Sequence, residues 1–226
     1  MNYNWDFSII WQARSTLLHG LLVSFELTAF CIFVGTLLAI PLSVVLARRG
    51  VAAKIATPFV EAVRALPILV LLIWFYYVVP NLFHLSLSAF WTAAWVLAIN
   101  LAAFAADILR GAIEAIPTEH IEAAEALGMT RRLIVKRIVI PEMFRRSVPS
   151  LTAMYITMFK FSTLASVISV WELLHASDSV IINTYHPLEV YTAVAVIYLV
   201  VVIPAALGAR SLERNPAFAI APSDSQ

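Results

Sequence analysis

A stretch of 42 residues without a charged side chain constrains the fold of this chain more than any other feature. No Asp, Glu, Lys or Arg occurs from residue 65 to residue 106. As one α-helix this stretch would be about 63 Å long, twice the roughly 30 Å thickness of the hydrocarbon core of a bilayer. We therefore expect it to cross a membrane twice, with the turn at Pro80–His84, where proline and asparagine are residue types that interrupt helices.

The rest of the chain indicates the same class of protein. Of its 226 residues, 62% are hydrophobic and 13% are charged, whereas soluble domains carry about 25% charged residues. The sequence predicts an all-α integral membrane protein with a single transmembrane domain over 1–226. Residues 1–12 lack a basic region, so we expect an interfacial aromatic arm and not a signal peptide. The predicted spans cover residues 17–47, 58–79, 85–107, 148–170 and 190–209.

Basic residues predict the orientation of the five helices. They follow the first, third and fifth spans, whereas the connections after the second and fourth spans contain none. Connections rich in Lys and Arg stay in the cytoplasm. We therefore expect the N-terminus outside, and the C-terminus and the connection 110–146 inside.

The connection 110–146 contains seven of the fifteen Lys and Arg residues of the chain. Its pattern predicts a short helix capped by Thr118 and ending at Gly128, where glycine easily adopts a left-handed conformation. A second helix is expected to start at Thr130 and to end before Pro141, which lacks a backbone N–H. Attraction to anionic lipid headgroups explains the basic face of this second helix. That face comprises Arg131, Arg132, Lys136 and Arg137.

One spacing in this connection resembles the EAA loop of permease subunits of bacterial ABC importers. The family pattern is EAA, three residues, Gly, nine residues, Ile, one residue, Leu and Pro. The matching residues are Glu122-Ala123-Ala124, Gly128, Ile138 and Ile140-Pro141, with Ile140 in place of Leu. The resemblance implies a type I ABC importer permease with five transmembrane helices. It also implies that the 117–128 helix docks into a cytoplasmic ATPase subunit, with coupling through Glu122, Ala123, Ala124, Gly128 and Pro141.

The resemblance also implies a set of partners in the bacterial cytoplasmic (inner) membrane. These are an ATPase dimer, a second permease subunit, identical or different, an extracytoplasmic solute-binding protein and the lipid bilayer. ATP would be used by the ATPase, so this chain is expected to bind no cofactor, metal or nucleic acid and to catalyse no reaction. In agreement, it has no G-x-x-x-x-G-K-[ST] motif, and its five histidines lack zinc-ligand spacing.

Lys160 interrupts the fourth predicted span. A cation at the centre of a bilayer costs about 2.5–3.5 kcal/mol on insertion scales, so we expect it to face the protein interior or a water-filled cavity. There it could meet a substrate carboxylate, form an interior ion pair or cap the carbonyls of a broken helix. The run Phe159–Leu164 resembles the K-x-T-S-L segment of polar amino-acid permeases. Ser162 and Thr163 are in swapped order, and Phe161 occupies a position that is often polar or acidic there.

Arg64-Ala65-Leu66-Pro67-Ile68-Leu69 resembles the R-G-T-P-L-L segment of the same family, with Leu66 in place of threonine. Arg64 and Pro67 thus join Lys160, Ser162 and Thr163 as candidates for the translocation path of a small polar solute, in the first place an amino acid. Arg64 could equally be an inner-leaflet anchor. The competing hypothesis is a secondary transporter or channel that works without ATP and uses Lys160 as its proton or ion site.

Overall fold

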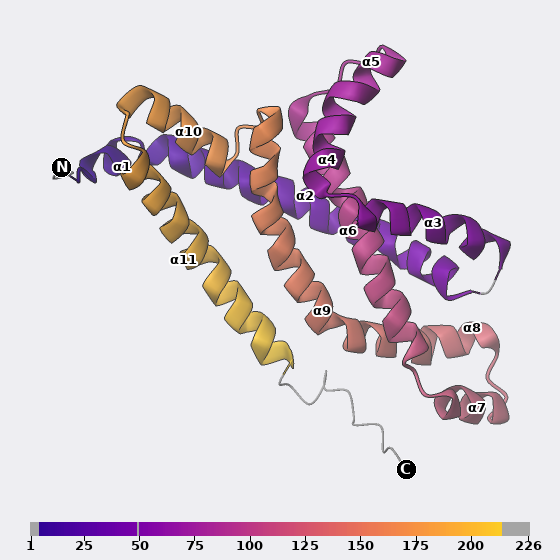
Figure 1. Ribbon diagram of the computed structural model, residues 1–226. Helices are drawn as coiled ribbons and strands as arrows, with labels where there is room; N and C mark the ends of the chain where they lie inside the picture. The colour runs from indigo at the N-terminus through magenta and orange to yellow at the C-terminus, as the bar shows by residue number, and fades with distance from the viewer. Residues whose placement is uncertain (1–4, 49, 214–226) are drawn as a thin grey trace.

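The computed structural model describes residues 5–48 and 50–213, and within these ranges it contains helices and no strand (Figure 1). Two five-residue segments, η1 and η2, are wide π-type turns, and η3 is a tighter 3-10 helix. The elements in chain order are α1 (Ser8–Gln12), α2 (Arg14–Ala47), α3 (Val51–Ala65), α4 (Ile68–Ile73), η1 (Trp74–Val78), α5 (Val79–Phe83), α6 (Ala89–Glu114), α7 (Thr118–Ala126), α8 (Arg131–Ile134), η2 (Val135–Val139), α9 (Ile140–Phe161), η3 (Ser162–Ile168), α10 (Leu173–Thr184) and α11 (Pro187–Glu213).

Four helical stretches are long and apolar enough to cross a membrane, and the bent pair formed by α3 with α4–α5 would make a fifth. The four are Arg14–Ala47, Ala89–Glu114, Arg131–Ile168 and Pro187–Ser211. The prediction of an all-helical membrane protein therefore agrees with the described part of the chain, and the predicted number of five spans is reached if the bent pair crosses the membrane as one span.

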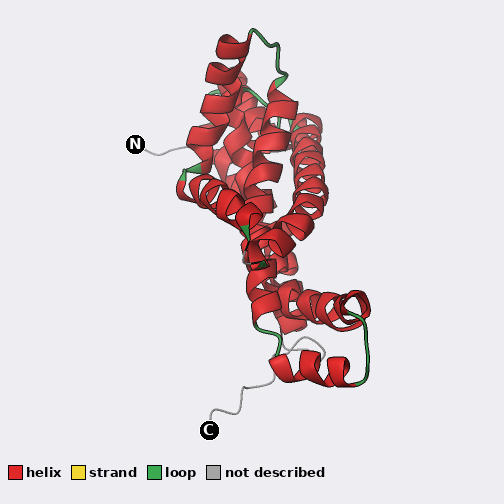
Figure 2. Cartoon of the chain, turned by 90° about the vertical axis from the view of Figure 1, so that its right-hand side faces the viewer, coloured by secondary structure: helices red, strands yellow, loops and turns green. Residues whose placement is uncertain are grey.

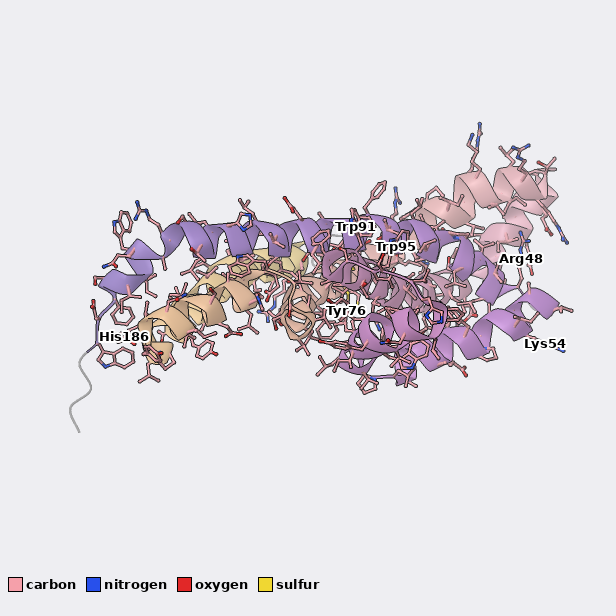
Figure 3. All side chains as sticks on the ribbon, turned by 90° about the horizontal axis from the view of Figure 1, so that it is seen from above. Arg48, Lys54, Tyr76, Trp91, Trp95 and His186 are labelled. Atoms are coloured by element: carbon pink, nitrogen blue, oxygen red, sulfur yellow. The ribbon has the colours of Figure 1, made fainter. Side chains whose placement is uncertain are left out.

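The packing of α2 against α6 forms the centre of the molecule. Gly35 of α2 allows the close approach, because a Cβ atom there would lie 2.9 Å from the Ala98 carbonyl oxygen of α6. Farther along, Phe30 packs edge-on to both Trp91 and Trp95, with ring centroids 5.4 and 5.5 Å away. The two tryptophans share one face of α6, as their spacing predicts (Figure 3).

The second predicted span is not one helix. Where the sequence predicts a span over 58–79, α3 begins earlier, at Val51, and is bent by 101° relative to the stretch Ile68–Phe83. The break lies at Leu66, which is extended, and at Pro67. A proline disfavours the helical conformation of the residue before it and supplies no N–H of its own. Together these effects end α3 completely.

Pro141 does not end a helix, so that prediction is wrong. The helix that begins at Arg131 continues through η2 into α9, and Pro141 lies in the first turn of α9. In a regular helix the proline ring would strike the carbonyl four residues earlier. The wide turn η2 immediately precedes it, and such a turn displaces that carbonyl. Helical structure is therefore retained from the charged connection into the fourth span.

The connections gather at two ends of the molecule. Helices α7 and α8 project beyond the bundle of spans (Figure 2). At the opposite end, α10 occupies the connection between the fourth and fifth spans, packs against α2 and lies near α1 (Figure 1). His186 lies at this end, far from Arg48 and Lys54 (Figure 3). The structure thus separates the charged connection from the connection that contains no Lys or Arg.

Candidate functional site

The helix α7 ends in a left-handed glycine corner. Gly128 has φ +75°, and nothing lies within 4 Å of a Cβ atom built on it. Its amide donates to the Glu125 carbonyl at 2.9 Å, and the Met129 amide donates to the Ala124 carbonyl at 3.1 Å. These two bonds satisfy carbonyls that the helix end would otherwise leave free, and the geometry favours glycine at the left-handed position. The predicted conformation of Gly128 is confirmed.

The start of α7 is held by a different contact from the predicted one. Pro117 occupies the N-cap position, and Thr118 is already helical, with no side-chain capping bond. The predicted cap is therefore wrong. Instead, His120 Nδ1 lies 2.8 Å from Glu142 Oε1 in the first turns of α9. This contact ties α7 to the base of the fourth span. Sequence reasoning missed it because the two residues are 22 positions apart.

The EAA residues lie on two different faces of α7. Ala124 is buried, whereas Glu122, Ala123 and Leu127 are exposed. Leu127 at the glycine corner has 82% of its surface accessible. Ala124 is the one buried residue of α7, which packs against α8, and the other side chains of the motif leave an exposed surface of acidic, small and apolar groups. Pro141 is exposed at the start of α9, apart from this face.

A chain of charges links the broken second span to α6. Arg64, one turn before the break, places Nη1 2.9 Å from Asp107 Oδ2 on α6. Arg110 binds the other oxygen of the same carboxylate at 2.6 Å and pairs with Glu114 at 3.0 Å. The guanidinium of Arg64 also lies over the Phe104 ring, 5.3 Å from its centroid. Arg64 is therefore positioned by α6, the helix that leads directly into α7.

The segment around Lys160 is the second break in a span. The α-helix ends at Phe161 and continues as the tighter η3. The Ser162 hydroxyl donates to the Phe159 carbonyl and the Thr163 hydroxyl to the Lys160 carbonyl, each at 2.8 Å. These hydroxyls therefore satisfy the carbonyls at the break. Within residues 5–48 and 50–213 the Lys160 side chain is exposed and forms no ion pair or hydrogen bond.

The two breaks lie in elements that touch each other. The helix α4, which starts directly after Pro67, packs against η3, which starts directly after Lys160 and Phe161. In many transporters, discontinuous helices near mid-membrane supply backbone groups to the substrate site. The contact joins the segment after Pro67 to the segment that contains Ser162 and Thr163, whereas Arg64 lies on α3 and pairs with Asp107 of α6. A separate apolar groove of about 260 Å³ between α2, α9 and α11 contains none of them.

Glu172 is a fully buried carboxylate that the sequence reasoning left without a role. It lies outside the spans and caps α10 by accepting hydrogen bonds from the amides of Leu174 and His175, each at 2.9 Å. Ser24 of α2 accepts from the Leu173 amide at 3.1 Å. Burial raises the pKa of Glu172 to about 7, although the two amides act to lower it. An acidic residue directly before an apolar helix is the signal that could have identified this cap.

Two broken helices that meet among apolar spans are an arrangement typical of membrane transport proteins. The chain matches the family described as "Binding-protein-dependent transport system inner membrane component" over residues 32–216. It belongs to that family, and it is a multi-pass protein of the bacterial inner membrane. The resemblance to ABC importer permeases predicted from the sequence is confirmed, and the hypothesis of a secondary transporter is not supported.

Individual relatives agree with this assignment. The chain is 36% identical to the octopine transport system permease protein OccM of Rhizobium meliloti, over 84% of this chain and 81% of OccM. It is 30% identical to the glutamine transport system permease protein GlnP of Escherichia coli, over 93% and 97% of the two chains. A chain in the crystal structure of an amino acid ABC transporter with histidines superposes with a TM-score of 0.87 at 28% identity, covering 94% of this chain and 99% of that one. Both sequence relatives are named as transport permeases.

Proposed function

We propose that this chain forms half of the translocation path of an ATP-driven importer of a small polar solute, an amino acid in the first place. Its partners would be a cytoplasmic ATPase dimer, a second permease subunit and an extracytoplasmic solute-binding protein. The observation that carries the proposal is the free face of α7 with its left-handed corner at Gly128. The names of the relatives, which refer to octopine and glutamine, support an amino-acid solute.

Coupling would use the exposed face of α7. Glu122, Ala123 and Leu127 would contact the ATPase, and Gly128 would fix the direction in which the chain leaves the helix. Two contacts would carry a displacement of α7 into the spans. His120 connects α7 to α9, and the Arg64–Asp107 pair connects α6 to the end of α3. ATP would be bound and hydrolysed by the partner, and this chain would need no cofactor or metal.

The translocation path would run past the two helix breaks. Lys160 has no acidic partner among the described residues, and its cationic side chain is suited to a substrate carboxylate. Ser162 and Thr163 would maintain the break by bonding its carbonyls, and Pro67 would maintain the break in the second span. Arg64 would position the end of α3 through Asp107.

Co-purification with the candidate ATPase subunit tests the coupling proposal. In Gly128→Val, a β-branched side chain must adopt φ +75°, which costs about 1–2 kcal/mol. We expect the amount of ATPase retained on the solubilised permease to fall about tenfold. Gly128→Asn, which tolerates the left-handed region, should retain most of the complex.

Gly111→Val is the matched control for this experiment. Gly111 lies in α6 with ordinary helical φ, and nothing lies within 4 Å of an added Cβ. The control should therefore co-purify like the wild type. Equal retention by Gly128→Val would show that the corner is not part of the docking surface. Failure of the wild-type chain to retain any ATPase, together with solute uptake driven by a proton gradient alone, would overturn the importer proposal itself.

A further inference from the structure

An open groove of about 670 Å³ lies at the turn between α2 and α3. Arg48 and Lys54 line it together with the apolar side chains of Leu46, Val51 and Pro58. Cationic groups therefore stand beside a hydrocarbon surface at the end of a membrane span. The labelled side chains of Arg48 and Lys54 both lie at one end of the molecule (Figure 3).

The two cations are not neutralised by the described part of the chain. Arg64, Arg110 and Arg146 all have carboxylate partners within 4 Å. Within residues 5–48 and 50–213, neither Arg48 nor Lys54 forms an ion pair or a side-chain hydrogen bond. The groove therefore holds two positive charges that attract an anion from outside the chain.

The adjoining face of α3 is apolar and uncovered. Val51, Ile55 and Phe59 are spaced four residues apart and have exposed fractions of 75%, 71% and 59%. Val60 and Val63 on the other side of α3 are buried. A helix with one buried face and one exposed apolar stripe beside a basic cluster is suited to the interface of a membrane. The stripe begins in the groove, because Val51 belongs to both.

We propose that this groove is a binding site for one anionic phospholipid. The phosphate lies between Arg48 and Lys54, and an acyl chain follows the apolar wall of the groove along the Val51–Ile55–Phe59 stripe. A free phosphate or nucleotide would use the cations and leave the apolar wall exposed to water. A zwitterionic lipid would cover the wall, but its headgroup brings a cation together with its phosphate and so leaves the net positive charge of the groove uncompensated. An anionic lipid satisfies both features.

The position of the groove gives the lipid a role in the fold. It lies at the start of α3, and the Arg64–Asp107 pair lies at the end of the same helix. The lipid and the ion pair thus fix α3 from both ends, directly before the 101° break that leads into α4. The site depends only on the placement of α2 and α3 in a membrane. The cytoplasmic leaflet follows if the proposed orientation holds.

Native mass spectrometry of the full chain tests the site. The chain is equilibrated with equal amounts of dioleoylphosphatidylglycerol and dioleoylphosphatidylcholine in detergent, and the retained lipids are counted. We expect a strong preference for one phosphatidylglycerol molecule. Each cation near an anionic surface favours an anionic lipid about fivefold. The double variant Arg48→Gln with Lys54→Gln should therefore reduce the retention of phosphatidylglycerol about twenty- to thirtyfold.

Two further variants separate a site from general attraction to negative charge. Arg131→Gln with Arg132→Gln removes the same charge from α8 and should leave this one tightly held lipid in place. Ala53→Phe fills the groove and leaves both cations intact, and it should also reduce retention. Equal losses in the α8 and groove double variants, or full retention by Ala53→Phe, would overturn the proposal. Competition by glycerol phosphate at the same concentration would overturn the role of the acyl chain.

Thermal unfolding shows whether each variant is folded. Cys31 is the only cysteine of the chain and is fully buried, so its reaction with a thiol-reactive dye reports opening of the α2 packing. The ATPase pull-down of Gly128→Val is a separate measurement, because Gly128 lies in the α7 lobe and not at the groove. Failure of the coupling proposal and failure of the lipid site can therefore be distinguished.

Discussion

Among the described residues, the Lys160 side chain forms none of the structural contacts that its position in a span led us to consider. Sequence reasoning left open an interior ion pair or a cap on the carbonyls of a broken helix. In the described part of the chain, the side chain has no such partner, and Thr163 instead bonds the Lys160 carbonyl. An exposed cation in an apolar span is costly, so its retention without a structural partner favours contact with substrate or water.

Replacing this lysine should therefore impair transport without unfolding the protein. We expect Lys160→Met to change the free energy of unfolding by less than about 0.5 kcal/mol, because no contact is broken. ATP-dependent uptake of the solute into proteoliposomes should fall at least tenfold, and Lys160→Arg should restore part of it. Uptake and Cys31 labelling measure the two effects. A large loss of stability with unchanged uptake per folded molecule would assign Lys160 a structural role.

At the scale of elements, the close approach of α2 and α6 shows how packing selects particular residues. Lipid competes with apolar side chains for every surface of a span, so helix association relies on van der Waals contact between closely fitting surfaces. Gly35 provides such a surface, because an added Cβ would lie 2.9 Å from both the Ala98 carbonyl oxygen and a Leu101 side-chain carbon. Backbone cannot move aside as a flexible side chain can.

We expect Gly35→Val to destabilise the bundle by about 1–3 kcal/mol, the usual cost of overpacking a well-filled interior. Thermal unfolding followed by dye labelling of Cys31, which lies one turn away on α2, measures the change. Gly208→Val is the matched control, since it lies within a span helix and nothing lies within 4 Å of its added Cβ. Equal melting temperatures for the two variants would contradict the packing argument.

At the scale of the whole molecule, the distribution of basic residues and the fold indicate the same orientation in the membrane. The α7–α8 lobe and the α2–α3 turn carry basic residues, whereas the connection that contains α10 carries no Lys or Arg. The structure places the lobe and α10 at opposite ends (Figure 1). Because basic connections are retained in the cytoplasm, the lobe is expected inside and α10 outside.

Cysteine labelling in intact cells tests this orientation. In a Cys31→Ser background, Asn183→Cys places an exposed thiol on α10, and Leu127→Cys places one on the lobe, where the native side chain is 82% exposed. A membrane-impermeant maleimide should label position 183 in intact spheroplasts and position 127 only after permeabilisation. The reverse pattern would show that the proposed orientation is inverted.

The sequence by itself determined the properties that depend on neighbouring residues. A charge-free stretch longer than one crossing requires a membrane protein with paired spans, and the family spacing around Gly128 identifies an importer permease. The left-handed conformation of Gly128 follows in the same way from the chemistry of one residue at the end of a short helix. Hydropathy and backbone preference depend on nearby residues in the sequence, so they can be predicted without knowing the tertiary contacts.

Only the tertiary structure decided the features that join distant parts of the chain. The second span is bent by 101°, and a helix continues through Pro141. Arg64 pairs with Asp107, and His120 contacts Glu142. The groove is formed by the end of α2 and the start of α3. A proline signals an interruption, but whether it bends, breaks or only widens a helix depends on the surrounding packing and on where the freed carbonyls find partners. Those partners are set by contacts across the fold, which local sequence does not encode.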